Sequence, residues 1–311
     1  MYIHRLHEKY EAVRNEAIKR CRPDELYTLQ SSMVDGRQVQ FSVERTYTYL
    51  FSHIQWQAAI VREKIYQHKD VLTKSCDVDL VTEWDRKVEK LLIDGISSRY
   101  PDHRFIGEES TSSEQKIELT NAPTWIIDPI DGTMNFVHGL PYICISVALL
   151  INKITEIGIV YNPILEQLFT ARKGQGAFLN GAPIHVSNEK ELRKALVMLE
   201  MGTSRDPEKL KIVLQNITLL ISHVHGIRSF GAAALNMCMV ALGGVDVSFE
   251  FGIHAWDVAA GDLIVREAGG VSIDPAGGPF DMMSRRTLCA SSMELAQQLS
   301  KILIQYYPVR D

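Results

Sequence analysis

Acidic residues follow a predicted strand at a spacing that indicates a cation site. The apolar run Trp125–Ile127 is followed by Asp128 and Pro129, and Asp131 comes shortly after them. Proline has no backbone N–H to donate, so the run is typical of a buried strand that ends in a turn at Asp128. Two carboxylates that leave one strand end together repel each other and resist loss of water. We therefore expect a cation between them.

Two more acids stand at the ends of predicted elements. Glu108 follows a short strand predicted over 105–106, and Asp257 follows Trp256 where a helix is predicted to begin. Mg²⁺ prefers oxygen ligands, so these acids and the main-chain carbonyl of Ile130 are suited to hold about two or three ions. Such ions neutralise a substrate phosphate and lower the pKa of a bound water. The residue types point to hydrolysis of a phosphate ester.

Periodicity predicts the elements that place Glu108 and the first two aspartates. Apolar residues recur at helical spacing over 44–69 and again over 85–100. Between these helices, residues 71–81 mix β-branched and polar side chains, which is typical of a hairpin or extended arm. A third helix is predicted to begin at Thr133 or Met134.

The remainder of the chain shows two different rhythms. Short strands separated by turn signals over 142–179 predict an antiparallel meander. Beyond residue 187 strands and helices alternate, and we expect a last helix over 257–267 that is closed by Gly269 and Gly270. Sheets packed against helix pairs predict an α/β (α+β) layered sandwich.

Composition bounds the class of protein. The 311 residues carry a formal net charge of −5, which argues against general affinity for nucleic acid or an anionic membrane. No run approaches the roughly 18 apolar residues of a membrane span, and no signal-type segment opens the chain, so a cytoplasmic protein is expected. The 5 cysteines lack CxxC spacing, which argues against a disulfide framework or a zinc site. Residues 1–42 read as an extension before a domain over 43–311.

Three motifs together resemble those of the inositol monophosphatase family, whose members are lithium-sensitive, Mg²⁺-dependent phosphatases. They are Gly-Glu-Glu at 107–109, Asp-Pro-Ile-Asp-Gly-Thr at 128–133 and Trp-Asp-Val-Ala-Ala-Gly at 256–261. The likeness is continuous over about residues 72–286. It implies a sugar-phosphatase fold with αβαβα layers, a homodimer, and a phosphorylated polyol, inositol monophosphate, as substrate.

The resemblance also implies roles for individual residues. It implies metal ligands at Glu108, Asp128, the Ile130 carbonyl, Asp131 and Asp257. It implies a hydroxyl–carboxylate pair, Thr133 with Asp85, that activates the attacking water, and a cation, Lys74, near the metal ligands. It implies substrate contacts at Asp131, Gly132, Thr133, Gly231, Ala233, Glu250 and Asp257. The amides of Gly132 and Thr133, at a helix start, would hold phosphate oxygens.

Two positions depart from the family pattern. Ala232 stands where the resemblance leads us to expect Ser or Thr beside the substrate, and Met134 replaces a common Thr. Neither is a predicted metal ligand, so the expected consequence is a change in substrate preference and not a loss of activity.

Other interpretations compete with these assignments. Asp128 and Asp131 alone would also fit a solvated acidic turn, and Asp85 a helix N-cap. Gly174 and Gly176 resemble a phosphate loop, but the hairpin signal after them favours a turn. The rival functions are a phosphatase for a nucleotide bisphosphate or a fructose bisphosphate, and a catalytically silent regulatory protein of the same fold.

Overall fold

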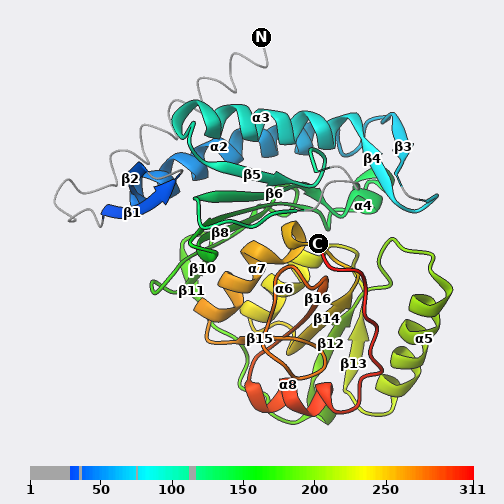
Figure 1. Cartoon of the computed structure of the whole chain (residues 1–311). Helices are drawn as coiled ribbons and strands as arrows, with labels where there is room; N and C mark the ends of the chain where they lie inside the picture. Colours follow the sequence, from blue (N-terminus) through cyan, green and yellow to red (C-terminus); the bar gives the residue numbers. More distant parts are fainter. Residues whose placement is uncertain (1–28, 35–36, 75, 112–116) are drawn as a thin grey trace.

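Two sheets form the central layers of the molecule (Figure 1). The computed structural model describes residues 29–34, 37–74, 76–111 and 117–311. The larger sheet has 7 strands in the order β11-β10-β9-β8-β7-β6-β5, antiparallel except for the parallel pair β5–β6. Its strands are β5 (Arg104–Gly107), β6 (Thr124–Asp131), β7 (Cys144–Ile151), β8 (Ile154–Asn162), β9 (Gln167–Arg172), β10 (Ala177–Leu179) and β11 (Ala182–Ile184).

The smaller sheet is built from the C-terminal part of the chain. Its 5 strands follow the order β13-β12-β14-β16-β15. β12 runs parallel to both β13 and β14, while the pairs β14–β16 and β15–β16 are antiparallel. The strands are β12 (Leu196–Leu199), β13 (Gly226–Arg228), β14 (Val247–Phe251), β15 (Val271–Ile273) and β16 (Arg286–Ala290).

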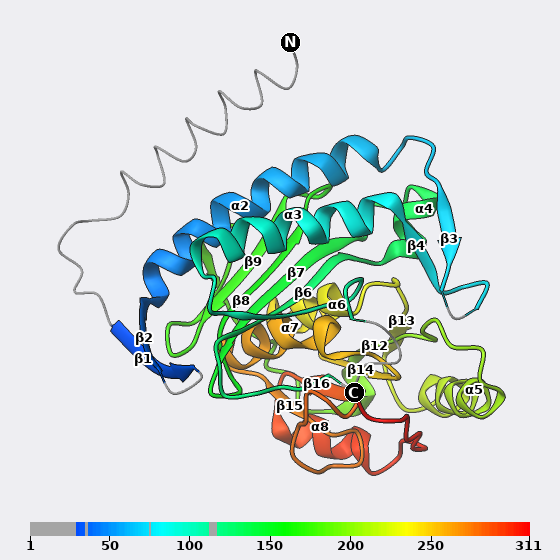
Figure 2. The same cartoon turned by 45° about the horizontal axis from the view of Figure 1, so that its top comes forward.

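Helix pairs cover and separate the sheets, as Figures 1 and 2 show. The first pair lies on the outer face of the seven-stranded sheet, the second lies between the sheets, and the third covers the smaller sheet. The pairs are α2 (Val43–Lys64) with α3 (Glu83–Arg99), α6 (Ala233–Ala241) with α7 (Ala255–Glu267), and α5 (Pro207–Ile221) with α8 (Met293–Ser300). The layer order predicted from the resemblance, αβαβα, is confirmed.

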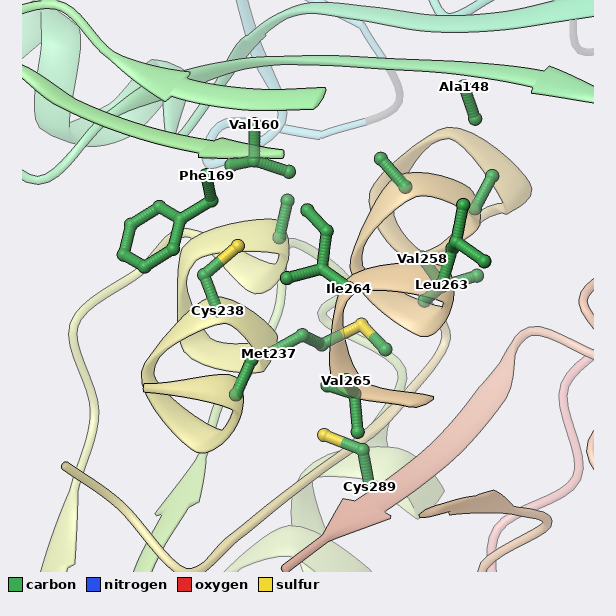
Figure 3. Close-up of a cluster of buried hydrophobic side chains, with 14 of the residues drawn as sticks. Ala148, Val160, Phe169, Met237, Cys238, Val258, Leu263, Ile264, Val265 and Cys289 are labelled. Carbon is green, nitrogen blue, oxygen red and sulfur yellow. The ribbon is translucent and has the colours of Figure 1, made fainter. Parts of the chain in front are cut away.

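Strands β6 and β7 are buried on both faces because helices cover the sheet on each side. Trp125 and Ile127 pack in the core below α2 and α3, whereas Ile126 packs in the core around α6 and α7. This alternation follows the period of two that a strand imposes on its side chains. Figure 3 shows the second core, where Ala148 and Val160 of the sheet face the α6–α7 pair.

Several predicted elements are confirmed. The strands β7, β8, β9 and β10 form the predicted antiparallel meander. The arm over 71–81 is a hairpin of β3 (Val71–Thr73) and β4 (Leu80–Thr82). The short helix α4 (Thr133–His138) begins at one of the two predicted positions.

Two expectations about elements were wrong. Strand β6 does not end at Asp128 but continues to Asp131, because its pairing with β7 shifts register between these residues and the irregularity accommodates Pro129. The helix over 257–267 is not the last, because α8 follows it. Ser292 starts α8 by accepting a hydrogen bond from the Leu295 amide at 3.2 Å, a start signal that the sequence reading missed.

The described residues before the first helix form a hairpin of β1 (Leu29–Val34) and β2 (Arg37–Ser42), which runs directly into α2. Residues 1–28 of the predicted extension lie outside the described residues, and the division at residue 42 stays a prediction. Among helices in the described part of the chain, none is long and apolar enough to cross a membrane.

Candidate active site

Three predicted metal ligands meet where the end of β6 lies close to the start of α7. Carboxylate oxygens of Asp128, Asp131 and Asp257 all lie within 4.8 Å of one another. The first two come from the irregular end of β6 and the third from the first turn of α7. Asp128 is 1% exposed and Asp131 6% exposed, so little water screens their charges. The bland interpretation of a solvated acidic turn is therefore wrong.

Burial and mutual repulsion raise the pKa of every member of this triad. The pKa of Asp128 lies well above its ordinary value. Desolvation is the largest cause of this shift, and repulsion from Glu108, Asp131 and Asp257 adds to it. Desolvation raises the pKa of Asp131 to about 7, and desolvation with repulsion from Asp131 raises that of Asp257 to about 7. A cation among these oxygens would remove the cause of the repulsion.

Helix N-termini hold two of the triad carboxylates in place. Asp131 accepts hydrogen bonds from the Ala233 amide at 3.1 Å and the Ala234 amide at 2.7 Å, both at the start of α6. Asp257 accepts one from the His254 amide at 2.6 Å, at the start of α7. Free amides and the positive end of a helix dipole both favour a negative charge there. The two helices thus fix these carboxylates with their charges facing each other.

Asp85 is anchored in a similar way at the start of α3. It is fully buried and accepts a hydrogen bond from the Thr82 amide at 2.8 Å, while Thr82 is the N-cap residue. Asp85 is therefore the third residue of a capping box and not the N-cap itself. Its other oxygen accepts a hydrogen bond from the Thr133 hydroxyl at 3.1 Å. Desolvation raises the pKa of Asp85 to about 6.

The Thr133 hydroxyl also lies 3.1 Å from the carbonyl oxygen of Ile130, the predicted main-chain ligand. The predicted hydroxyl–carboxylate pair and that carbonyl therefore share one hydrogen-bonding group. Asp128 accepts a hydrogen bond from the Ile130 amide at 3.0 Å, which shapes the turn between the two aspartates of β6. Apart from Asp85, all of these groups lie within one short stretch, 128–133.

Glu108 and Lys74 form an ion pair whose two side chains are partly exposed. The Lys74 ammonium lies 2.7 Å from Glu108 and 2.6 Å from Glu109. Burial alone would lower the pKa of Lys74, but the two carboxylates raise it above its ordinary value. Glu89 of α3 accepts a hydrogen bond from the Glu109 amide at 2.8 Å and so fixes the turn after β5. Glu109 is thus an ion-pair partner of Lys74.

Gly132 sits where no side chain fits. Its φ is 90°, and an added Cβ would lie 3.1 Å from the carbonyl oxygens of both Tyr142 and Gly231. The adjacent helix α4 is tied to the loop before α6, because Asn135 donates hydrogen bonds to the Tyr142 carbonyl at 2.8 Å and the Phe230 carbonyl at 2.6 Å. The predicted phosphate-binding amides therefore lie beside the loop that contains Gly231.

Glu200 organises that loop, and the sequence reading gave it no role. Its carboxylate accepts hydrogen bonds from the amides of Phe230 at 2.7 Å and Gly231 at 2.9 Å, and from the Ser229 hydroxyl at 2.6 Å. Glu250, on β14, is part of the same acidic surroundings, since Glu200 is among the charges that raise its pKa after desolvation. Glu200 follows β12 directly, so the rule that an acid follows a strand would have found it.

Comparisons with known proteins agree with this geometry. Residues 44–306 match the model of the inositol monophosphatase family. The chain belongs to the inositol monophosphatase family. It is 50% identical over 252 residues to inositol monophosphatase 1 of Bos taurus, covering 81% of this chain and 91% of that protein.

Solved structures of inositol monophosphatase relatives share the fold. The extragenic suppressor protein suhB of Bartonella henselae superposes with a TM-score of 0.75 at 30% identity, covering 83% of this chain and 97% of that one. The IMPase of Thermotoga maritima superposes with a TM-score of 0.74 at 31% identity, covering 83% and 96%.

The departure at Ala232 has a structural explanation in this member of the inositol monophosphatase family. Ala232 is the N-cap residue of α6 and has no side chain able to cap it. Asp131 supplies the missing acceptors from β6, so the helix start is satisfied without a hydroxyl at 232.

The loop at Gly174 and Gly176 is a turn, as predicted, and its amides donate to the Glu267 carboxylate at 2.7 and 2.8 Å.

Proposed function

We propose that this chain hydrolyses inositol monophosphates to inositol and inorganic phosphate with Mg²⁺ as cofactor. The observation that carries the proposal is the carboxylate triad, with Asp128 and Asp131 buried and Asp257 half-buried, beside the Thr133–Asp85 pair. Membership of the family and the 50% identity to a protein named inositol monophosphatase 1 support the same reaction. A phosphoric monoester hydrolase therefore fits both the chemistry of the site and the relatives.

The donor set fits Mg²⁺. The oxygens of Glu108, Asp128, Asp131, Asp257 and the Ile130 carbonyl are the hard ligands that this ion prefers. The raised pKa values of the three aspartates reflect burial and a concentration of negative charge that such an ion would offset. When bound, Mg²⁺ supplies charge neutralisation for the phosphate and for the leaving oxygen and makes water more acidic.

The protein's own groups orient the nucleophile. The Thr133 hydroxyl donates toward Asp85, which leaves the lone pairs of its oxygen to accept a hydrogen bond from the attacking water. Asp85, with a pKa raised to about 6, is placed to take up the water proton through that hydroxyl. Water would attack phosphorus in line and the polyol oxygen would leave, without a phosphoenzyme.

The two ends of the substrate would meet different walls of the site. The amides of Gly132 and Thr133 face the phosphate at the start of α4. Glu250, Gly231 and Ala233 would contact the polyol hydroxyls, and Asp131 and Asp257 would touch inositol oxygens. Lys74 would hold Glu108 in place through their 2.7 Å ion pair.

A comparison of substrates tests the proposal. Purified protein in Mg²⁺ should release phosphate faster from inositol 1-phosphate than from a fructose bisphosphate or a nucleotide bisphosphate. A preference for either bisphosphate would replace the proposed substrate, and failure to hydrolyse all three would favour a silent regulatory protein.

Finer properties belong to the same proposal. We infer about two or three Mg²⁺ ions, inhibition by lithium, assembly as a homodimer and a cytoplasmic location, with residues 1–42 as an extension to the phosphatase domain over 43–311. Light scattering of the purified chain would test the dimer, and lithium titration of phosphate release would test the inhibition.

A further inference from the structure

A lysine in the first half of α5 passes between two glycines toward the substrate side of the site. Lys209 is 2% exposed. A Cβ added at Gly202 would lie 2.5 Å from its Nζ, and one added at Gly252 would lie 2.9 Å from the same atom. Both glycines have positive φ, 67° and 85°. Gly202 and Gly252, which follow β12 and β14, carry no side chain, and the lysine ammonium occupies the space that their side chains would fill.

The ammonium of Lys209 lies near Glu250, the predicted ligand of the polyol. The point 2.5 Å from Nζ, where a Cβ at Gly202 would be, is also 3.5 Å from Glu250 Oε1. Burial lowers the pKa of Lys209, and the charge of Glu250 partly opposes that shift. The lysine and the glutamate therefore lie near each other at the predicted polyol end of the site.

Among the described residues, none accepts a hydrogen bond from the Lys209 ammonium, and no carboxylate lies within 4.0 Å of it. An ammonium without acceptors from the protein needs oxygen atoms from solvent or from a ligand, because an unsolvated charge is costly. Ligand oxygens at the polyol end of the site would supply such acceptors.

We propose that Lys209 is a specificity-determining residue that donates a hydrogen bond to an oxygen of the polyol. This oxygen lies beside the hydroxyl from which Glu250 accepts a hydrogen bond. The inference rests on the proposed function and adds a residue to its substrate contacts. Hydroxyl groups donate to Glu250 and accept from Lys209, so a polyol satisfies both.

The test compares Lys209→Met with Lys211→Met. Methionine has a similar length without the charge, so it can fill the buried path of the lysine side chain. Lys211 lies on the same helix but is exposed, so its substitution makes the same change of net charge at an exposed position. Each protein is assayed for KM and kcat with inositol 1-phosphate, for the inhibition constant of inorganic phosphate, and for Tm.

The expected result is a selective loss at the polyol end. Lys209→Met should raise KM for inositol 1-phosphate by about tenfold or more, as loss of a charged hydrogen bond requires. Inorganic phosphate should inhibit the variant as it inhibits the wild type, and Lys211→Met should match the wild type throughout.

Two results would overturn the assignment of Lys209. One is an unchanged KM, whether or not Tm falls, and the other is an equal loss of affinity for substrate and inorganic phosphate. If the wild type itself releases no phosphate from inositol 1-phosphate, the proposed function fails. An active wild type with an unaltered Lys209→Met variant rejects only the role of Lys209.

Discussion

The hydroxyl of Thr133 lies 3.1 Å from the carboxylate of Asp85, although 48 residues separate them in the chain. Thr133 lies in the first turn of α4, and Asp85 lies in the first turn of α3. The second carboxylate oxygen of Asp85 accepts a hydrogen bond from the Thr82 amide, so the start of α3 fixes the orientation of Asp85 toward Thr133. The contact joins the helical layer to the carboxylate triad.

Removal of either partner of this contact should lower kcat. Thr133→Ala and Asp85→Asn should each reduce it by about 10²- to 10⁴-fold, because a positioned base of this kind contributes that much. KM should change little, and the double variant should be no worse than the poorer single one, since the two residues act together. Thr133→Ser keeps the hydroxyl and should retain most activity. Equal losses in Thr133→Ser and Thr133→Ala would contradict the assignment.

Asp257→Asn should abolish phosphate release and keep the fold. The substitution removes one of three neighbouring carboxylate charges that repel one another, so Tm without metal should not fall. Mg²⁺ should raise the Tm of the wild type, because it binds only the folded protein, and should raise that of the variant much less. Thermal melts with and without Mg²⁺ measure this independently of activity, and an undiminished Mg²⁺ shift would remove Asp257 from the ligands.

Asp311 fixes the start of the helix that carries Asp257. Its side chain is 4% exposed, lies 2.8 Å from His254 Nδ1, and accepts a hydrogen bond from the Ala255 amide at 3.2 Å. Asp311→Ala should reduce the free energy of unfolding by about 1–3 kcal/mol, since buried donors lose their acceptor. It should also raise the Mg²⁺ concentration needed for half-maximal rate.

The neighbouring ion pair provides the control for Asp311. Arg310 pairs with Asp281, and their side chains are 59% and 41% exposed. Arg310→Ala should change neither stability nor the Mg²⁺ requirement appreciably, because exposed pairs contribute little. Equal effects in both variants would mean that the end of the chain acts only as packing.

His103 should make stability depend on pH. Burial lowers its pKa to about 4, and its Nδ1 accepts a hydrogen bond from Trp125 Nε1 at 3.0 Å, which requires the neutral ring. The unfolded chain binds a proton near pH 6.5 and the folded chain does not, so this contribution is present above pH 6.5 and is lost as pH falls toward 4.

A matched variant isolates the histidine from the titrating carboxylates. The free energy of unfolding of the wild type, minus that of His103→Gln, should fall by about 1.4 kcal/mol per pH unit between pH 6.5 and 4. Chemical denaturation at several pH values measures the difference. A difference independent of pH would show that His103 titrates alike in both states.

Local patterns in the sequence predicted much of the fold. Apolar stripes placed α2 and α3, and alternation placed the meander, because these signals act over a few residues. The end of β6 was not predictable in this way: Pro129 reads as a stop, whereas the register shift lets the strand reach Asp131. That shift depends on pairing with β7, which no local pattern reveals.

The residues of the candidate site could likewise be predicted only in part. Local motifs predicted the acids that the structure brings together, Asp128, Asp131 and Asp257, and the resemblance added Asp85, Lys74 and Glu250. Lys209 and Asp311 were not predicted, because each acts through contacts with residues distant in the chain and carries no local signal. Their roles depend on two glycines at strand ends and on where the last residues pack.

The most direct test of the central claim is phosphate release from inositol 1-phosphate as Mg²⁺ is titrated, with wild type and Asp128→Asn side by side. Wild-type release should rise from the level without enzyme, saturate with Mg²⁺ and stop when a chelator is added, while Asp128→Asn should stay at the level without enzyme. Release by the wild type without a divalent cation, or equal release by both proteins, would contradict it.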